Sequence, residues 1–433
     1  MMDAEPTPHP HDAPHRHVVK DAHQSRGRPP TKVLRSLLVA AVAAAVGCGQ
    51  DQARSPCADP LTPAPVVDCS GARCPAIVVT GDPPAANAGT FKGHADPTVV
   101  HDPAVAERVW LAYSWPHVVP GRAPDGAPVL MAAVSTHLAR SDDGGRTFSY
   151  VAAPWPAVPT TDPEGSGGNG IDSSETPSLV TMASGGTVTW YGAHLRYFLQ
   201  PQTGYHPKYG TSWTVRVGAA PSPAELATAN EAVLGVSATA AEYRPDARLD
   251  QVAGLPLTRC AMLNNPTLFA RDGRLYLIVE CLAFLGTTLD LERSTTQVFA
   301  TVPDGPPATW SWRHAGMLAD HGLAREFGGD TIYQPDVSLA GDGTPLFIAT
   351  PAHEDSRAVV GTVGDGCVAL ELASIDPPAL GRDCEGRPIV RARVDGTGIG
   401  ACTHDSRSVT GIVSTLKAEI DGDWSLHASG ARP

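Results

Sequence analysis

The stretch "NNPTLFARDGRLYLIVE", residues 264–280, joins a polar pair, a proline, an apolar run, an Asp-Gly turn and a second apolar strand. The same form recurs from Ala95, Glu175 and Gln334, and the four prolines fall at positions 97, 177, 266 and 335. A fifth segment from Ala401, "ACTHDSRSVTGIVSTLKA", keeps the two-strand rhythm without the proline. Spacings of 80, 89, 69 and about 66 residues leave room for one four-stranded antiparallel sheet per repeat. Internal repetition of strand pairs at such a period is typical of a β-propeller.

The rest of the chain agrees with an all-β architecture. Short β-type runs are divided by turn residues, and the 433 residues include 43 Gly and 41 Pro. The best helical candidate, residues 222–235, is short. We therefore predict a single β-propeller from residue 76 to 433 with five blades of four antiparallel strands, and leave six blades open as the alternative. The strand "PAIVVTG", residues 75–81, is expected to close the ring by joining the last blade.

A second motif, "SDDGGRTF" at residues 141–148, fits the pattern S-x-D-x-G-x-T-F. Its Asp can accept backbone N–H bonds within a turn, and its glycines permit a positive φ. The motif resembles the Asp-box of bacterial neuraminidase repeats, which occurs in sialidases and in many other propellers. A degraded copy lies at 299–312. The resemblance implies a turn at the blade periphery, so we interpret Asp142 and Asp143 as scaffold.

The sequence does not carry the sugar-binding residues of a sialidase in a recognisable pattern. Such enzymes hold the sugar carboxylate with three arginines, because a forked guanidinium matches it bidentately. One of those arginines belongs to a motif at the first blade, where this chain reads "HADPTVV", residues 94–100, without an arginine. The spacing of the remaining arginines assembles no triad.

The Pro-marked strands carry another resemblance, to five-bladed hydrolases of the arabinanase, xylosidase and invertase type. These begin the first blade with Asp-Pro and place an Asp and a Glu at the starts of later blades. The resemblance implies Asp96 and Glu175 as candidate catalytic carboxylates. In the third blade Asn264 and Asn265 stand where a general acid is expected, which departs from the family's pattern. Glu280 is the other candidate acid, and its alternative interpretation is a structural Glu paired with an arginine between blades.

Residues that start the innermost strands should converge on the propeller axis and bind a ligand there. As substrate-binding candidates the sequence offers a polar and aromatic set from several repeats: Asn265, Gln334, Asp336, Tyr191, Arg196 and His404. Aromatic and cationic side chains suit sugar stacking, and they suit ordinary blade packing as well.

The N-terminus predicts export. Basic residues precede the apolar run at 37–47, which is too short to span a membrane, and Cys48 follows. "AVGC" resembles a bacterial lipobox, with Ala45 where Leu is usual. We expect residues 1–47 to be an extension and signal peptide, Cys48 to be lipidated, and 48–75 to be a Pro/Ala-rich tether. Ordinary signal cleavage with Cys48 free or paired is the alternative. The protein would then be an exported lipoprotein of the bacterial cell envelope, at the outer membrane or cell surface, touching the membrane through its lipid only.

Charge and cysteine content narrow the partners. The net charge is -13 and no basic cluster follows residue 50, which argues against nucleic acid. Apart from Cys48 the chain has eight cysteines, enough for up to four disulfides in an exported protein. Cys367 with Cys384 and Cys260 with Cys281 are the local pairings that we predict. No nucleotide-binding or zinc motif occurs, so we expect no cofactor and no metal.

These observations favour a monomeric, carbohydrate-binding propeller that is a candidate glycoside hydrolase at its axial pocket. The alternative is a non-catalytic propeller of the cell surface that binds a glycan or protein, or that serves only as structure, because propellers host unrelated functions.

Overall fold

The computed structural model describes residues 63–83, 92–122, 126–161, 169–199, 213–236, 246–249, 252, 260, 262–285, 288–354, 362–417 and 423–433. The predicted signal peptide and its lipidation site, Cys48, lie outside these residues. Within them, no helix is both long and apolar enough to cross a membrane.

The described residues form five mainly antiparallel sheets, and the predicted all-β, five-bladed propeller is confirmed. Blade one runs outward through β5 (Ala95–His101), β6 (Val109–Arg122), β7 (Pro128–Ser141) and β8 (Phe148–Trp155). Blade two runs through β10 (Asn169–Ser184), β11 (Thr187–Leu199), β12 (Thr214–Ala220) and β13 (Glu231–Val236), while β9 (Val158–Thr161) pairs with the start of β10.

The later blades follow the same plan. Blade three runs through β14 (Met262–Arg271), β15 (Arg274–Leu285), β16 (Thr288–Thr301) and β17 (Arg313–Ala319). Blade four runs through β18 (Thr331–Leu339), β19 (Pro345–Glu354), β21 (Gly366–Ile375) and β23 (Val390–Asp395), with β20 (Thr362–Gly364) and β22 (Pro378–Leu380) as short additions. Blade five has β24 (Ile399–His404), β25 (Ile412–Lys417) and β26 (Asp423–Ala428).

Helical segments are short. The α-helix α1 (His321–Glu326) is capped by the Asp320 side chain, which accepts the Leu323 N–H. The 3₁₀ turns are η1 (Ser70–Ala72), η2 (Ala224–Thr228) and η4 (Pro307–Thr309). The helix predicted over 222–235 is wrong: η2 covers five residues and the rest becomes β13, because pairing with β12 outweighs local helix propensity.

The core lies between blades, where every pair of neighbouring sheets encloses a hydrophobic cluster. Strand β15 shows how the sequence achieves this. Leu275, Leu277 and Val279 pack toward blade two, and the alternate residues Tyr276 and Ile278 pack toward blade four. A strand that is covered on both faces reads as a continuous apolar run, as "LYLIV" does here.

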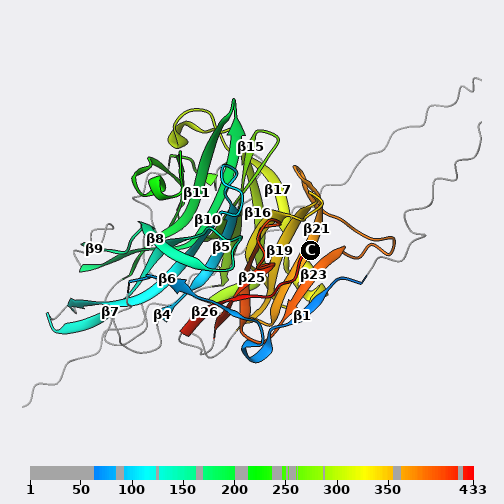
Figure 1. Cartoon of the computed structure of the whole chain (residues 1–433), viewed down its shortest axis with the longest axis horizontal. Coiled ribbons are helices and arrows are strands. Elements are labelled where there is room, and N and C mark those ends of the chain that lie inside the picture. The colour runs from blue at the N-terminus through cyan, green and yellow to red at the C-terminus, as the bar shows by residue number, and fades with distance from the viewer. Residues whose placement is uncertain are drawn as a thin grey trace, which may run out of the picture. The chain divides into compact units, whose positions relative to one another are not determined.

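Strands before the first repeat close the ring. β2 (Ala76–Ile77) pairs antiparallel with β26 of blade five, as predicted for 75–81, and β3 (Val79–Thr80) then pairs with β8 of blade one. β4 (Lys92–Gly93) also pairs with β26. β1 (Val66–Asp68), blue in Figure 1, runs parallel to the orange β23 of blade four, so sheet pairing begins inside the predicted tether, before residue 76. One short segment thus joins blades four, five and one.

Each inner strand carries the same irregularity. β5, β10, β14, β18 and β24 all have a β-bulge in their pairing with the second strand of the blade. In every bulge one residue other than glycine adopts a positive φ between 44° and 51°: Asp96, Thr176, Asn265, Gln334 and Ala401. In four blades the next residue is the repeat proline, and in blade five it is Cys402. The bulge leaves these positions outside the ladder, so the missing proline N–H costs no ladder hydrogen bond.

Side chains next to the bulges link the blades in a circle. Ser114 accepts the Thr176 N–H (2.8 Å), Ser178 accepts the Leu268 N–H (2.9 Å), and Thr267 donates to the Pro335 carbonyl (2.6 Å). Asp336 accepts hydrogen bonds from Thr403 and from the His404 backbone, and Thr403 also accepts the Val99 N–H (3.4 Å). The five interfaces are therefore each crossed by at least one such bond near the axis.

Two of the predicted disulfides are wrong. Cys367 bonds to Cys402 across blades four and five, where both side chains are buried, and Cys69 bonds to Cys74 beside η1. Cys384 is disulfide-bonded, but not to Cys367. No disulfide joins Cys260 to Cys281: the Cys260 thiol donates to the Met262 carbonyl, and Cys281 is a buried thiol.

We predict that removing the Cys367–Cys402 disulfide with paired alanines lowers the free energy of unfolding by about 4 kcal/mol, because it closes a 35-residue separation. The matched control is the Cys69–Cys74 pair, with a separation of 5, for which the same loop-closure relation gives about 2 kcal/mol. Denaturant titration monitored by tryptophan fluorescence measures both. If the Cys69–Cys74 removal lowered the free energy of unfolding as much as the Cys367–Cys402 removal, or more, the effect would not come from chain entropy.

Candidate active site at the propeller axis

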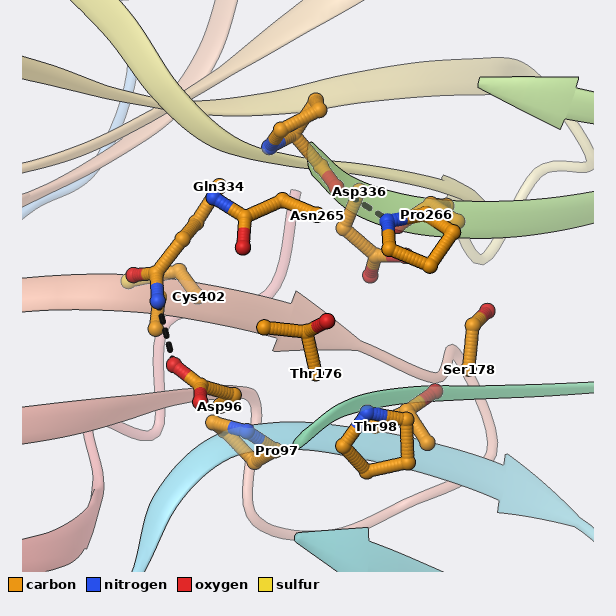
Figure 2. Close-up of a pocket in the computed structure, with 14 residues that line it drawn as sticks. Asp96, Pro97, Thr98, Thr176, Ser178, Asn265, Pro266, Gln334, Asp336 and Cys402 are labelled. Carbon is orange, nitrogen blue, oxygen red and sulfur yellow. Dashed lines mark hydrogen bonds between the residues drawn. The ribbon is translucent and has the colours of Figure 1, made fainter. Parts of the chain in front are cut away.

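The five bulges bring residues from all five blades to one pocket at the propeller axis. Figure 2 shows the side chains of Asp96, Thr176 and Gln334 lying around a common space. The residues that line the pocket are three from each Pro-marked strand, at 96–98, 176–178, 265–267 and 334–336, together with Ala401 and Cys402. A positive φ is strained for residues other than glycine, and such strain concentrates at binding and catalytic sites. Five copies around one pocket mark the axis as the candidate site.

The axial pocket is small. Its volume is about 30 Å³, which holds about two water molecules. A sugar ring cannot enter it whole, so a ligand can place one small polar group at the axis.

Asp96 is the carboxylate of blade one. It accepts a hydrogen bond from the Gln334 side-chain amide of blade four and another from the Ser114 hydroxyl. Burial raises the pKa of Asp96 to about 6, and the two hydrogen bonds counteract that rise. The predicted catalytic candidate therefore lines the pocket, with a carboxyl group that titrates near neutral pH.

Glu175 is the second predicted carboxylate, and its place in the blade differs from the expectation. Because the bulge residue directly precedes each proline, Thr176 is the counterpart of Asp96, and Glu175 lies one residue earlier. Glu175 accepts a hydrogen bond from the Tyr197 hydroxyl (2.8 Å). Burial raises the pKa of Glu175 to about 8, and the negative charge of Asp96 contributes to the rise. The two carboxyls are thus close enough to be electrostatically coupled.

Glu280, the weaker candidate acid, lies on β15 directly opposite Asn264 and is 2% exposed. It accepts hydrogen bonds from the side-chain amides of Asn264 (3.2 Å) and Asn265 (3.0 Å) and from the Gln334 backbone N–H. Burial raises the pKa of Glu280 to about 7; the hydrogen bonds lower it, and the Asp96 charge adds to the rise. Its partners are amides, and no arginine of the described residues pairs with this carboxyl, contrary to the alternative interpretation of the sequence.

Asp336 lines the pocket, and its carboxylate also belongs to the circle of bonds between blades. Burial raises its pKa to about 6, against the lowering effect of bonds from Thr403 and from the Val337 and His404 backbones. Asn265 and Gln334 line the same pocket. Three of the six predicted binding residues are therefore brought together with Asp96.

The other three predicted binding residues do not line the pocket. Tyr191 is buried in the cluster between blades two and three, with its ring centroid 5.7 Å from that of Trp310. Arg196 is paired with Asp172 at 2.8 Å. His404 is 3% exposed, and burial lowers its pKa. Strand alternation alone could not separate these packing positions from the axis.

The sequence interpretation missed Thr176 as a pocket residue. Its side chain is 6% exposed, it lines the pocket, and its Oγ1 has no hydrogen-bond partner among the described residues. Aligning the repeats on the residue directly before each proline would have shown that Thr176, and not Glu175, is the position equivalent to Asp96.

The turn at 141–148 holds the β7–β8 hairpin. Asp143 accepts the Arg146 and Thr147 backbone N–H groups (3.0 Å each) and the Thr147 hydroxyl (2.7 Å). The Ser141 hydroxyl also donates to this carboxyl (2.6 Å), and its bond, together with those from Thr147 and Arg146, holds the pKa of Asp143 down, at about 2. The turn also contacts blade five, where the Gly144 carbonyl accepts the Val409 N–H (2.9 Å). None of its residues lines the axial pocket.

No protein-family model and no curated protein matches the chain. Among solved structures it is similar to an exo-inulinase from Aspergillus awamori, with 9% identity over 79% of this chain and 62% of that chain and a TM-score of 0.44. It is also similar to a family 117 glycoside hydrolase of the marine bacterium Zobellia galactanivorans, with 10% identity over 78% of this chain and 85% of that chain and a TM-score of 0.41. A third similar structure is a GH32 β-fructofuranosidase of Bombyx mori, with 13% identity over 70% of this chain and a TM-score of 0.39. This chain spans about half the length of that protein, 53%. At such identities the likeness concerns the fold alone.

The raised pKa of Glu175 makes a prediction about stability. A carboxyl whose pKa is raised by folding contributes stability that is complete below its unfolded value of 4.5 and is lost as pH rises toward 8. The variant Glu175→Gln avoids that loss. We expect its free energy of unfolding, relative to the wild type, to increase between pH 5 and pH 8 by up to about 1.4 kcal/mol per pH unit.

The control is Asp143→Asn in the β7–β8 turn, whose carboxyl has a lowered pKa and stays ionised over the whole range. Its effect on the free energy of unfolding should be the same at pH 5 and pH 8. A flat difference for Glu175→Gln as well would mean that folding does not raise the pKa of Glu175.

Proposed function

We propose that the axial pocket binds a carbohydrate and hydrolyses a glycosidic bond. The observation that carries the proposal is the pair Asp96 and Glu175, two carboxyls from different blades that are electrostatically coupled and differ in pKa. Two neighbouring carboxyl groups whose environments separate their pKa values are the requirement for acid and base roles at one site.

The surroundings of the two carboxyls assign the roles: two hydrogen bonds counteract the rise at Asp96, whereas the Asp96 charge adds to the rise at Glu175. Asp96 has the lower pKa of the two, so it acts as the general base that takes a proton from the attacking water. Glu175 has the higher pKa and stays protonated at neutral pH, so it protonates the leaving oxygen. The Tyr197 hydroxyl orients Glu175, and the Gln334 amide orients Asp96.

A second candidate function is glycan binding without catalysis. It is favoured by Asn265, which stands in blade three where the hydrolase resemblance expects an acid, and by the small volume at the axis. In this case the carboxyls serve as hydrogen-bond acceptors for sugar hydroxyls.

We also propose that the protein is exported and tethered through lipidated Cys48. The disulfides Cys69–Cys74 and Cys367–Cys402 support an oxidising compartment.

For the hydrolase, we predict that Asp96→Asn and Glu175→Gln each lower kcat/KM by about 10²- to 10⁴-fold on a chromogenic glycoside that the wild type cleaves. The panel covers furanosides and pyranosides of both anomers. The wild-type pH profile should rise through about 6, where Asp96 ionises, and fall above about 8, where Glu175 loses its proton.

The matched controls are Asp142→Asn and Asp143→Asn, which change carboxyls outside the pocket and should keep wild-type kcat/KM. Wild-type inactivity across the panel, with sugar binding retained, would favour the non-catalytic alternative. Full activity in both axial variants would disprove the assignment of Asp96 and Glu175.

A further inference from the structure

We propose that the axial pocket selects a sugar that carries a protonated amine, and that the amine occupies this small pocket. The inference rests on the proposed function for the sugar nature of the ligand. Its charge selectivity follows from the donors, acceptors and charges that surround the axis.

The hydrogen-bond donors at the axis are already engaged. The side-chain amides of Asn264 and Asn265 donate to Glu280, and that of Gln334 donates to Asp96. The Gln334 backbone N–H also donates to Glu280. In four of the five blades the residue after the bulge position is a proline, which has no N–H to offer. These contacts and the prolines reduce the number of backbone and amide N–H groups that a ligand can reach, while the hydroxyls of Thr98, Thr176 and Ser178 remain in the lining.

Acceptors are in excess. The Thr176 Oγ1 and the Asn264 Oδ1 are buried and have no hydrogen-bond partner within the described part of the chain. Thr176 lines the pocket and lies in the middle of the view in Figure 2. A buried polar atom without a partner is costly, so the Thr176 hydroxyl, which can accept as well as donate, calls for a polar ligand group. An ammonium group supplies three donors and no acceptor.

The charge at the axis has one sign. Asp96 and Asp336 line the pocket, and Glu175 and Glu280 are buried carboxyls of blades two and three that lie near enough to be affected by the Asp96 charge. None of the described lining residues is Lys, Arg or His. Buried carboxylates are normally paired with a cation or neutralised by protonation. A ligand cation would fill that place, whereas a sialic or uronic acid would meet only negative charge.

The dimensions agree with an ammonium group. A pocket volume of about 30 Å³ admits one small group with its hydrogen bonds, while the acetamide of an N-acetylated sugar is larger and carries an acceptor oxygen. No group of three His, Cys, Asp or Glu side chains in the described residues is arranged to hold a metal ion.

The test is isothermal titration of the full-length protein at pH 7 with glucosamine, galactosamine and mannosamine. Each is compared with its N-acetylated form and with the neutral parent sugar, and glucuronate is the anionic control. We expect at least one amino sugar to bind tenfold or more tightly than both of its matched sugars, and glucuronate not to bind. The preference should shrink at pH 5, where the axial carboxyls are protonated.

Two variants locate the amine. Asp96→Asn should abolish the preference for the amino sugar, and Thr176→Val, which keeps the shape and removes the unpartnered hydroxyl, should reduce it several-fold. Thr181→Val, on the same strand β10 outside the pocket, is the matched control and should bind as the wild type does.

Equal affinity for amino and neutral sugars, or failure of every amino sugar to bind, would overturn the inference. Binding of calcium chloride at the pocket in place of the amino sugar would overturn it as well. These outcomes are distinguishable from failure of the proposed function. Cleavage of neutral glycosides that depends on Asp96, without amine preference, leaves the hydrolase standing and removes the inference. Amine-selective binding without any glycosidase activity supports the inference and removes the proposed hydrolase activity.

Discussion

The structure depends on one repeated constraint, a β-bulge at the start of every inner strand. The bulge turns a residue with positive φ toward the axis and frees its neighbour from the ladder, which allows a proline there. Each such conformation costs about 1–3 kcal/mol and persists only where its surroundings determine it. Here the surroundings are the hydrogen bonds of Ser114, Ser178, Thr267, Asp336 and Thr403, which connect each blade to the next.

The same constraint creates the chemistry of the pocket. Carboxyls that are remote in sequence come to lie near one another, so burial raises their pKa values and the Asp96 charge adds to the rise at Glu175 and Glu280. The prolines of the lining have no N–H, and the side-chain amides of Asn265 and Gln334 hold carboxyls in place. The links between blades and the clustering of carboxyls at the axis thus both follow from the bulged inner strands.

The two sequence motifs serve different parts of the molecule. The turn at 141–148 resembles a catalytic site because it combines acid and hydroxyl groups. The Asp143 carboxylate, however, accepts hydrogen bonds from the turn's own N–H groups. The plain Pro-marked repeat, in contrast, supplies the residues of the pocket. A local hydrogen-bond network satisfied within a few residues indicates structure, whereas polar groups that recur at long intervals can meet at an axis.

The sequence alone determined the five blades, the closing strand and four polar residues of the pocket, because repeats of equal form must occupy equivalent positions around a ring. It could not determine what depends on contacts between blades. The register of Glu175 follows from the bulge, the pairing of Cys367 with Cys402 from the meeting of blades four and five, and the strand at 231–236 from its partner β12. The pKa values of the carboxyls and the unpartnered hydroxyl of Thr176 likewise exist only in the closed ring, since burial and neighbouring charge are properties of tertiary structure.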